Sequence, residues 1–530
     1  MLDRETVFGV KVAVAVFVTA WLVLDLALRW LGRAETGRRL RDATLAAAGL
    51  VALLCWWNLL RFGFDDRAPT LSWVHFSDAF HYYMGPKYFR ELGYTHLYDC
   101  SAAAEQQLGD GPRVARRTYR DLETNEVVSG GAILARSRAC QASFSPERWQ
   151  LFVHDVAWFR SRMPGWETTM QDWGYNATPA WNVLGSWVAG NGPVSERRIA
   201  WLSVLDVPVV LSMWALVVWT FGWRTACVAL AFWGTNLAGG YNWTGGSILR
   251  QEWLLASAAG VCLLRKEKWV AAGAAITYAA SLAIFPAALA LGTAVRLVLD
   301  SWRQRRLRLA PESLRLLLGA ALAVAVVVPL SAQRAGGIGA WLRFADNIRG
   351  DMQPAPNNVG LPMLLSYDGD TRLRMLTLEN RARPAADWGE LRKETLAGRR
   401  LWLLLAVAAY AALFVGAARS QPEWVTAILG LGFPVLALQL SCYYWAVLLL
   451  YGFLWPRFAG VGVALSALSV ASHAIYGRWP DPEEYSTWFS GLGVLFVYYA
   501  AAVACFAGRW AHFLHVPRTK LQSSQIARAM

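Results

Sequence analysis

Long apolar stretches, each bounded by short polar or basic segments, recur along the chain from residue 8 to residue 507. The first two cover residues 8–30 and 43–61, and each is about as long as a helix that crosses a hydrocarbon core. The first stretch is too long for the apolar part of a cleavable signal peptide, and a second one follows soon after it. The pattern therefore predicts an all-α polytopic membrane protein.

The remaining apolar segments predict a bundle of about thirteen crossings in total. They begin near residues 200, 225, 247, 269, 314, 401, 424, 442, 458 and 486. The stretch 269–299 lies between two basic clusters, so we interpret it as a hairpin of two short helices that breaks near Phe285 and Pro286. The chain then divides into five parts: two N-terminal helices (1–61), a first loop (62–199), a helical core (200–331), a second loop (332–399) and a C-terminal helical part with a basic tail (400–530).

Basic residues between the apolar segments predict the orientation. They form three clusters: Arg38, Arg39 and Arg41; Arg265, Lys266 and Lys268; Arg303, Arg305, Arg306 and Arg308. The positive-inside rule places these clusters in the cytoplasm, which makes both large loops extracytoplasmic and puts the N-terminus outside. The net charge of +14 is then explained without a nucleic-acid partner. We expect an integral protein of a bacterial plasma (inner) membrane, in contact with membrane lipids.

The first loop contains Cys100 and Cys140, which are the only cysteines in either large loop. They flank a polar stretch of hairpin character, Arg117 to Gly130. In an oxidising compartment the two thiols predict a disulfide, and the alternative is a pair of free cysteines. Residues 177–190 are apolar but short, which is typical of a helix that lies at the membrane surface or re-enters the membrane.

The stretch after the second crossing carries the most distinctive chemistry. On a helix, Asp78, His81 and Tyr82 share one face. A carboxylate near the outer membrane face, beside a histidine and a tyrosine, is suited to act as a general base. The alternative is that Asp78 caps a helix or forms a surface ion pair. We expect the apolar side of the same stretch to lie on the bilayer surface: Tyr88, Phe89 and Leu92.

Three segments together resemble a known family. They are 78–98, with Asp78, Tyr82-Tyr83, Lys87-Tyr88, Leu92-Gly93 and Leu97-Tyr98; 174–181, Gly-Tyr-Asn-Ala-Thr-Pro-Ala-Trp; and 245–253, Gly-Gly-Ser-Ile-Leu-Arg-Gln-Glu-Trp, followed by Arg265-Lys266 and Ala272-Gly273. In this order they resemble the first outer loop and the following helices of GT-C glycosyltransferases, most closely the polyprenyl-phosphate mannosyltransferases of glycosyltransferase family 87. The similarity covers roughly residues 45–300.

The resemblance implies an inverting transfer of mannose, or of another hexose or pentose, from a polyprenyl-phosphate donor to a lipid or glycan acceptor. The family's loop-one aspartate corresponds to Asp78, the expected general base. The leaving phosphate needs positive charge as its own charge develops. Arg250 is the first candidate for this role, with Lys87 and His81 as further candidates. The alternatives are an arginine that snorkels to the interface and a lysine on a solvated face.

Neighbouring residues in the same segments are expected to contact substrate: Tyr82, Tyr83, Tyr175, Gln251 and Glu252. The sequence also departs from the family pattern. No basic residue precedes Pro286, and residues 441–445 contain no histidine. No Asp-x-Asp pair lies near Asp78 in the first loop, so we expect a metal-independent enzyme that has no cofactor.

Two other classes of function remain open from the sequence. A lipid or solute transporter or flippase would place charges near helix centres and would often show a repeat between its halves. The interior charges here are few, chiefly Asp25 and Asp206, and no repeat is evident. A non-catalytic assembly subunit would have no organised pocket around Asp78. The sequence also has no Walker A motif, which excludes transport driven by an ATPase within this chain.

Overall fold

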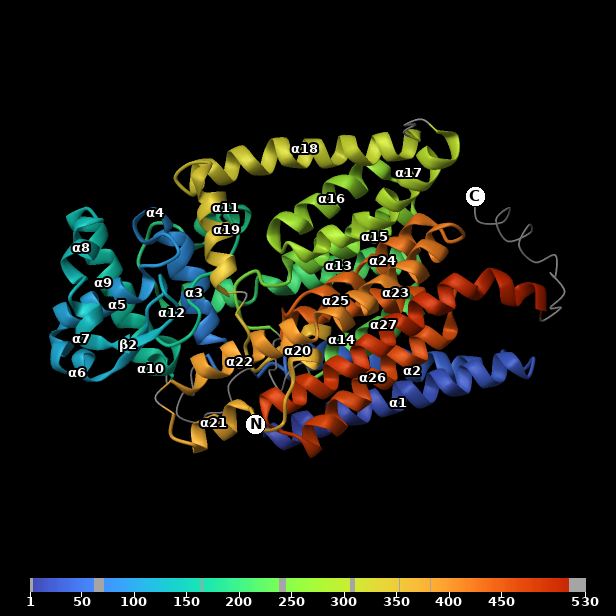
Figure 1. Cartoon of the computed structure of the whole chain (residues 1–530), viewed down its shortest axis with the longest axis horizontal. Helices are drawn as coiled ribbons and strands as arrows, with labels where there is room; N and C mark the ends of the chain where they lie inside the picture. The colour runs from blue at the N-terminus through green and yellow to red at the C-terminus, as the bar shows by residue number, and fades with distance from the viewer. Residues whose placement is uncertain are drawn as a thin grey trace.

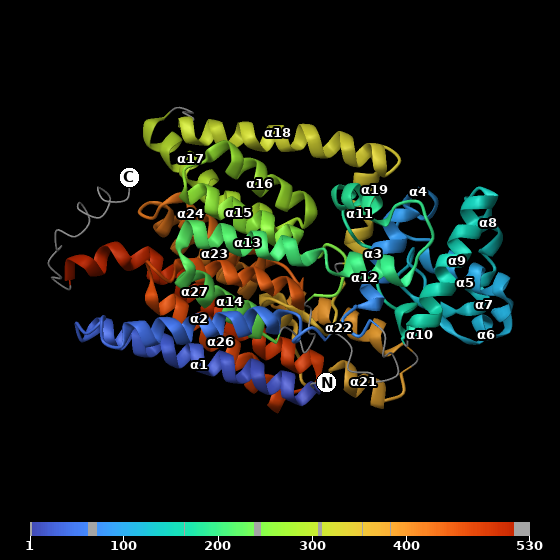
Figure 2. The same ribbon diagram turned by 180° about the vertical axis from the view of Figure 1, so that it is seen from behind.

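The computed structural model describes residues 3–61, 71–163, 165–237, 245–305, 310–351, 353–381 and 383–513. This part of the chain is almost entirely helical, with two short two-stranded ladders. Figures 1 and 2 show a bundle of long helices that run roughly side by side, and a smaller domain from the first loop at one end of it. The end of α17, the start of α18 and the turn between α1 and α2 lie at the opposite end.

The helices of the bundle come from the first fifty-six residues and from the chain after residue 195. They are α1 (Arg4–Trp30), α2 (Arg38–Trp56), α13 (Asp206–Phe221), α14 (Trp223–Thr235), α15 (Glu252–Arg265), α16 (Trp269–Leu282), η3 (Phe285–Ala290), α17 (Leu291–Gln304), α18 (Pro311–Arg334), α23 (Arg400–Ala418), α24 (Glu423–Gly430), α25 (Gly432–Ala437), η4 (Cys442–Leu454), α26 (Ala459–Arg478) and α27 (Pro482–Phe513). Helix α12 (Glu196–Ser203), just before α13, packs instead with the first-loop domain (Figure 1).

Six helices in the described part of the chain are long and apolar enough to cross a membrane. They are Arg4–Trp30, Glu196–Phe221, Pro311–Arg334, Arg400–Ala418, Ala459–Arg478 and Pro482–Ala507. The chain is therefore an all-α integral membrane protein, as its apolar pattern predicts. The break predicted near Phe285 and Pro286 is present between α16 and η3, which α17 follows directly. Three further predicted crossings correspond to shorter apolar helices, Trp269–Leu282, Glu423–Ala437 and Cys442–Leu454, and the count of thirteen stays a prediction.

Small residues let neighbouring helices of the bundle approach closely. Helix α16 crosses α18 where Gly273 faces the carbonyl of Leu316 and Gly319 faces the carbonyl of Val270. A Cβ atom on either glycine would overlap that carbonyl oxygen. Close backbone contact of this kind is typical of helix association in lipid, where packing replaces the hydrophobic effect.

The first helix packs against the penultimate helix of the chain. The Oγ1 atom of Thr19 in α1 donates a hydrogen bond of 2.9 Å to Oγ of Ser466 in α26. Near the N-terminal end of α1, the ring of Phe8 lies edge-on to the ring of His473, with 4.8 Å between centroids. The buried ammonium of Lys11 donates a 2.6 Å hydrogen bond to Asn58, just beyond α2.

The first loop folds as a helical domain with its own aromatic core. Its elements are α3 (Phe76–Lys87), α4 (Phe89–Leu92), α5 (Leu97–Glu105), η1 (Gln106–Asp110), α6 (Gly111–Arg116), β1 (Thr118–Arg120), β2 (Val127–Ser129), α7 (Gly130–Leu134), α8 (Ser137–Ala142), α9 (Pro146–Arg162), α10 (Trp166–Thr169) and α11 (Pro179–Ala189). The antiparallel β1–β2 pair confirms the predicted hairpin. The prediction of a membrane-facing side was wrong, because Tyr88, Phe89 and Leu92 are buried in the domain core.

The second loop is also mostly helical in the described residues. It contains α19 (Gly339–Asp351), β3 (Asn358–Val359), α20 (Leu361–Ser366), α21 (Leu373–Leu378) and α22 (Pro384–Gly398). Strand β3 pairs with β4 (Leu440–Ser441), directly before η4. A buried ion pair between Arg392 and Glu483 joins α22 to the start of α27. These contacts hold the second loop against the bundle.

Candidate functional site

Helix α3 places Asp78 in its first turn, at the junction between the first-loop domain and the bundle. The imidazole of His75 caps the helix, because its Nδ1 accepts a 2.9 Å hydrogen bond from the backbone N–H of Asp78. A carboxylate in a first turn also interacts favourably with the helix dipole. Asp78 is nevertheless only 4% exposed, so its charge depends on the groups around it.

The segment that precedes α15 supplies two partners for Asp78. The hydroxyl of Ser247 donates a hydrogen bond to Oδ2 of Asp78. Nε of Arg250 lies 3.3 Å from the same oxygen. Gly246 allows this approach, because its φ is +90° and a Cβ atom there would overlap the carbonyl oxygen of Trp73. The backbone of 246–250 therefore brings a hydroxyl and a guanidinium to one buried carboxylate.

A second carboxylate, that of Asp206, binds the backbone at Arg250. The side chain of Asp206, at the start of α13, accepts hydrogen bonds from the backbone N–H groups of Arg250 at 3.0 Å and Gln251 at 2.9 Å. These N–H groups lie at the N-terminus of α15, where backbone donors lack helical partners. The guanidinium then lies over the ring of Tyr82, with 3.8 Å from Cζ to the centroid. Asp206 therefore positions the cation that faces Asp78.

Burial dominates the electrostatics of Asp78. It raises the pKa of this carboxyl from 3.8 to about 7, while Arg250 lowers the pKa and Asp206 and Asp172 raise it further. A pKa near neutrality is the value that suits a general base at physiological pH. The structure thus brings Arg250 from a distant part of the chain to Asp78 and Tyr82, as expected if the three residues belong to one site.

Further polar and aromatic groups line the continuation of this site along α15. Glu252 is buried at the first position of α15 and accepts a hydrogen bond from the hydroxyl of Tyr278 in α16. The ring of Trp253 packs edge-on against Tyr444, at 5.6 Å between centroids. Tyr443 lies 4.5 Å from Tyr444 between ring centroids and also approaches Arg250.

Tyr175 packs against helix α3. Its ring lies against Gly85, where a Cβ atom would overlap it, and packs edge-on to Tyr82 at 5.6 Å between centroids. Its hydroxyl donates to the side chain of Asn182 in α11. The short helix that the sequence predicts at 177–190 is α11, which packs against α3 and α18. Tyr175 therefore packs against the ring of Tyr82, and we assign it the role of holding that ring in position.

Lys87 requires a correction. Its ammonium is buried and forms a 2.5 Å ion pair with Asp155 of α9. It also donates to Tyr83 at 3.1 Å and to the carbonyl of Gly192 at 2.6 Å. These three partners occupy all three N–H donors of the ammonium, so none is left for a phosphate. The candidate roles of Lys87 in phosphate binding and of Tyr83 in substrate binding are therefore replaced by a structural role.

His81 requires a similar correction. Its Nε2 atom lies 2.8 Å from the hydroxyl of Tyr98 in α5. Burial lowers the pKa of His81 to about 4, although Asp172 opposes the shift. The imidazole is therefore neutral at physiological pH and cannot supply the positive charge that the sequence analysis assigned to it. Its place on the face of α3 beside Asp78 makes it a support for that helix.

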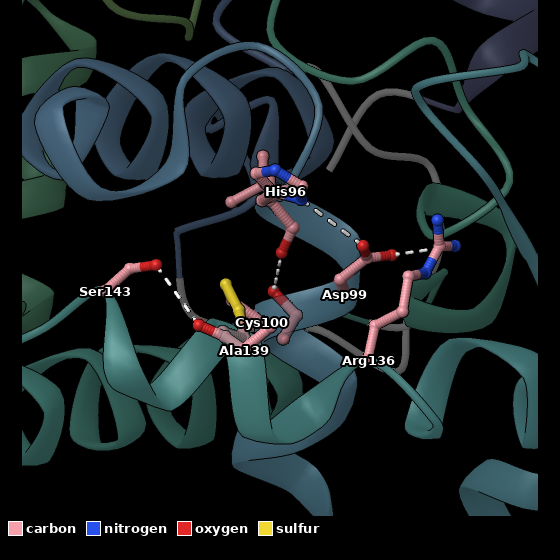
Figure 3. The surroundings of a disulfide bond; sticks show 9 residues. His96, Asp99, Cys100, Arg136, Ala139 and Ser143 are labelled. Carbon is pink, nitrogen blue, oxygen red and sulfur yellow. Dashed lines mark hydrogen bonds and ion pairs between the residues drawn. A yellow bond between two sulfur atoms is a disulfide. The ribbon is translucent and has the colours of Figure 1, made fainter.

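Cys100 and Cys140 form the predicted disulfide, which joins α5 to α8 with 5.4 Å between their Cα atoms. Figure 3 shows the polar contacts around it. Asp99, next to Cys100, lies 3.3 Å from the guanidinium of Arg136 and 3.4 Å from the imidazole of His96. The bond therefore lies inside the first-loop domain, away from α15.

Sequence reasoning missed three members of this site. Ser247 lies within the family-like segment 245–253 but had no assigned role. Asp206 was noted only as an interior charge, and Tyr443 lies in the segment 441–445, which was noted only because it contains no histidine. Gln251 contributes its backbone N–H.

Among the described residues, no group of three or more metal-binding side chains occurs. No family model matches the chain, and neither a curated protein nor a solved structure matches it.

Proposed function

We propose that this protein is an integral membrane glycosyltransferase of the GT-C type, which takes a sugar from a polyprenyl-phosphate donor. In this proposal the helices form about thirteen crossings, and the two loop regions and the site at Asp78 face the extracytoplasmic side. The observation that carries the proposal is a buried carboxylate, Asp78, in contact with a guanidinium and a hydroxyl at the end of a membrane bundle. The acceptor is a lipid or a glycan.

The transfer is a single displacement at the anomeric carbon of the donor sugar. Asp78 accepts the proton of the acceptor hydroxyl, and the hydroxyl oxygen forms a new bond to the anomeric carbon. The bond between that carbon and the phosphate oxygen breaks, and its electron pair leaves with the lipid phosphate. The configuration inverts, and the proton ends on Asp78. Its raised pKa of about 7 supports this role.

Arg250 supplies the positive charge that this displacement needs. It is the cation in contact with Asp78 in the described residues, and the backbone hydrogen bonds to Asp206 hold its position. A guanidinium presents several donors in one plane and is well suited to a phosphate. Arg250 therefore lies where it can stabilise the charge that develops on the leaving group in a buried site.

The test is sugar transfer by the purified protein in lipid vesicles, with a panel of polyprenyl-phosphate sugars and a membrane extract as acceptor. Asp78→Asn should lower transfer by about 100-fold or more, because it removes the general base. Arg250→Gln should lower it by a similar factor. The matched control is Asp346→Asn, which changes an exposed carboxylate in α19 and should leave transfer unchanged.

Each outcome has a different meaning. Full transfer by a folded Asp78→Asn protein contradicts the role of Asp78. An absence of transfer by the wild type from every donor contradicts the enzyme proposal and favours the alternative of a lipid or solute transporter. A flux assay with the same vesicles then measures transport directly.

A further inference from the structure

Glu252 has an unusual environment for a carboxylate. It is 8% exposed, and its Oε1 atom accepts a hydrogen bond from the hydroxyl of Tyr278. Its Oε2 atom is buried and has no hydrogen-bond partner among the residues that the structure describes. Buried carboxylate oxygens are nearly always hydrogen-bonded, because the loss of water is otherwise uncompensated. The second oxygen is therefore an acceptor available to a ligand.

The position of Glu252 links it to the site at Asp78. It directly follows Arg250 and Gln251, whose backbone N–H groups bind Asp206. Arg250 reaches Asp78 in α3, while Glu252 reaches Tyr278 in α16. One turn of backbone at the start of α15 thus presents two polar groups, one toward the first-loop domain and one toward the bundle.

Aromatic side chains lie beside these two polar groups. Tyr82 covers one side of Arg250, and Tyr443 approaches its guanidinium within 5.8 Å. Tyr444 contacts Tyr443 and the ring of Trp253, which follows Glu252. Small-molecule sites commonly combine apolar and aromatic walls with a few placed polar groups. This arrangement fits a ligand with an apolar face and a hydroxyl at its edge, which describes a sugar ring.

The chemistry of the pair favours a neutral hydroxyl over a metal ion. A carboxylate oxygen accepts a hydrogen bond, and the Tyr278 phenol can accept one while it donates to Glu252. A sugar hydroxyl, as a donor and an acceptor, satisfies such a pair. A metal ion needs several ligands, and no group of three or more metal-binding side chains is found in the described part of the chain.

We infer that Glu252 and Tyr278 together bind one ring hydroxyl of the transferred sugar, and that they determine which sugar the protein accepts. The inference rests on the proposed function, because it assumes that a sugar occupies the site at Asp78. The transferred group is then a sugar with a free hydroxyl at one defined ring position, and its monodeoxy analogue is a poor substrate. A site built to hydrogen-bond a hydroxyl rejects the analogue that lacks it.

The experiment compares a polyprenyl-phosphate sugar that the wild type transfers with its set of monodeoxy analogues. We expect Glu252→Gln and Tyr278→Phe to lower kcat/KM for the complete sugar by about 10- to 100-fold, the range for hydrogen bonds to a charged group. For one analogue, kcat/KM of the wild type should fall to the value that the variants show with the complete sugar. The variants should transfer that analogue no more slowly than the wild type does. The matched controls are Glu423→Gln, in α24, and Tyr498→Phe, in α27.

The outcomes separate this inference from the proposed function. Transfer by the wild type, together with unchanged selectivity in Glu252→Gln, overturns the inference and leaves the proposed function in place. An equal loss for every analogue also overturns it, because that result shows a structural role. A lack of transfer by the wild type from all donors overturns both. Thermal unfolding of each variant in detergent shows whether it is folded.

Discussion

At the residue scale, the environment of Asp78 balances two opposing effects. Burial favours the protonated carboxyl, while Arg250 favours the carboxylate. Ser247 adds a hydrogen bond to the oxygen that Arg250 contacts. The result is a carboxyl whose pKa lies close to the pH at which it would have to accept a proton. Groups with perturbed pKa values of this kind cluster at functional sites.

This balance predicts how transfer depends on pH. The base acts only when it is deprotonated, and the pKa of Asp78 is raised from 3.8 to about 7. The value of kcat/KM should therefore fall with a one-proton dependence as the pH decreases through about 7, because protonation removes the base. The measurement is initial transfer rates from about pH 5 to about pH 9 in vesicles.

Arg250→Gln provides the internal check on the pH profile. Since Arg250 lowers the pKa of Asp78, the midpoint of the residual activity should move to higher pH in this variant. A midpoint near 4 in the wild type, which is ordinary for an exposed carboxyl, would contradict the assignment of Asp78 as the titrating base.

The candidate site was only partly predictable from single residues. Asp78 and Arg250 stood out because a carboxylate and a cation lay near the predicted ends of apolar helices. Lys87 and His81 were misassigned, because their partners are remote in sequence. Asp155 is 68 positions from Lys87, and Tyr98, in the short helix α5, is 17 positions from His81. Local spacing carries no information on such pairs.

At the element scale, the first-loop domain depends on cross-links between short helices. Helices such as α5 and α8 are too short to be stable alone in water, so tertiary contacts must hold them. The Cys100–Cys140 disulfide and the buried Lys87–Asp155 ion pair provide two such contacts. Helix α3, which carries Asp78, packs against the α9 side of this framework.

Removal of the disulfide should weaken the domain without removing its chemistry. Cys100→Ser with Cys140→Ser should lower the free energy of unfolding by about 2–4 kcal/mol, the usual contribution of such a bond. Transfer at low temperature should persist, because the bond joins α5 to α8, and neither helix carries Asp78 or Arg250. The measurements are mass spectrometry under non-reducing conditions and thermal unfolding in detergent. Identical unfolding of the wild type and the double variant would contradict this prediction.

Prediction of the elements succeeded where apolar length or a proline was decisive. The long helices α1, α18 and α27 follow from apolar stretches, and the α16–η3 break follows from Pro286. Prediction did not identify the 3₁₀ helix η4, because its apolar composition fits any buried helix. The second loop was predicted only as polar loop, because helices α19 and α22 carry many charged residues.

At the scale of the whole molecule, both loop regions and the N-terminal end of α1 lie at one end of the bundle. The α1–α2 turn, which precedes the basic cluster at the start of α2, lies at the other end. This separation agrees with the charge distribution that the positive-inside rule describes. Which side of the membrane each end faces stays a prediction from the charge pattern, while the packing order of the helices depends on tertiary contacts that no local pattern encodes.

The orientation is directly testable. Glu147→Cys, on the exposed start of α9, should react in intact cells with a maleimide that does not cross membranes. Arg39→Cys, on the exposed start of α2, should react only after the membrane is permeabilised, because the positive-inside rule places it in the cytoplasm. Labelling of the unsubstituted protein is the background. The reverse pattern would invert the proposed topology.

The contact between α1 and α26 has a consequence for how the protein is made. Thr19 and Ser466 are 447 positions apart, so α1 enters the membrane long before its partner is synthesised. At about 5–20 residues per second, the ribosome needs about 20–90 s to make that interval. Lys11 meets its partner Asn58 far sooner, after 47 residues. The early pairing of α1 with α2 therefore keeps the ammonium of Lys11 away from lipid while the last helices of the bundle are still being synthesised.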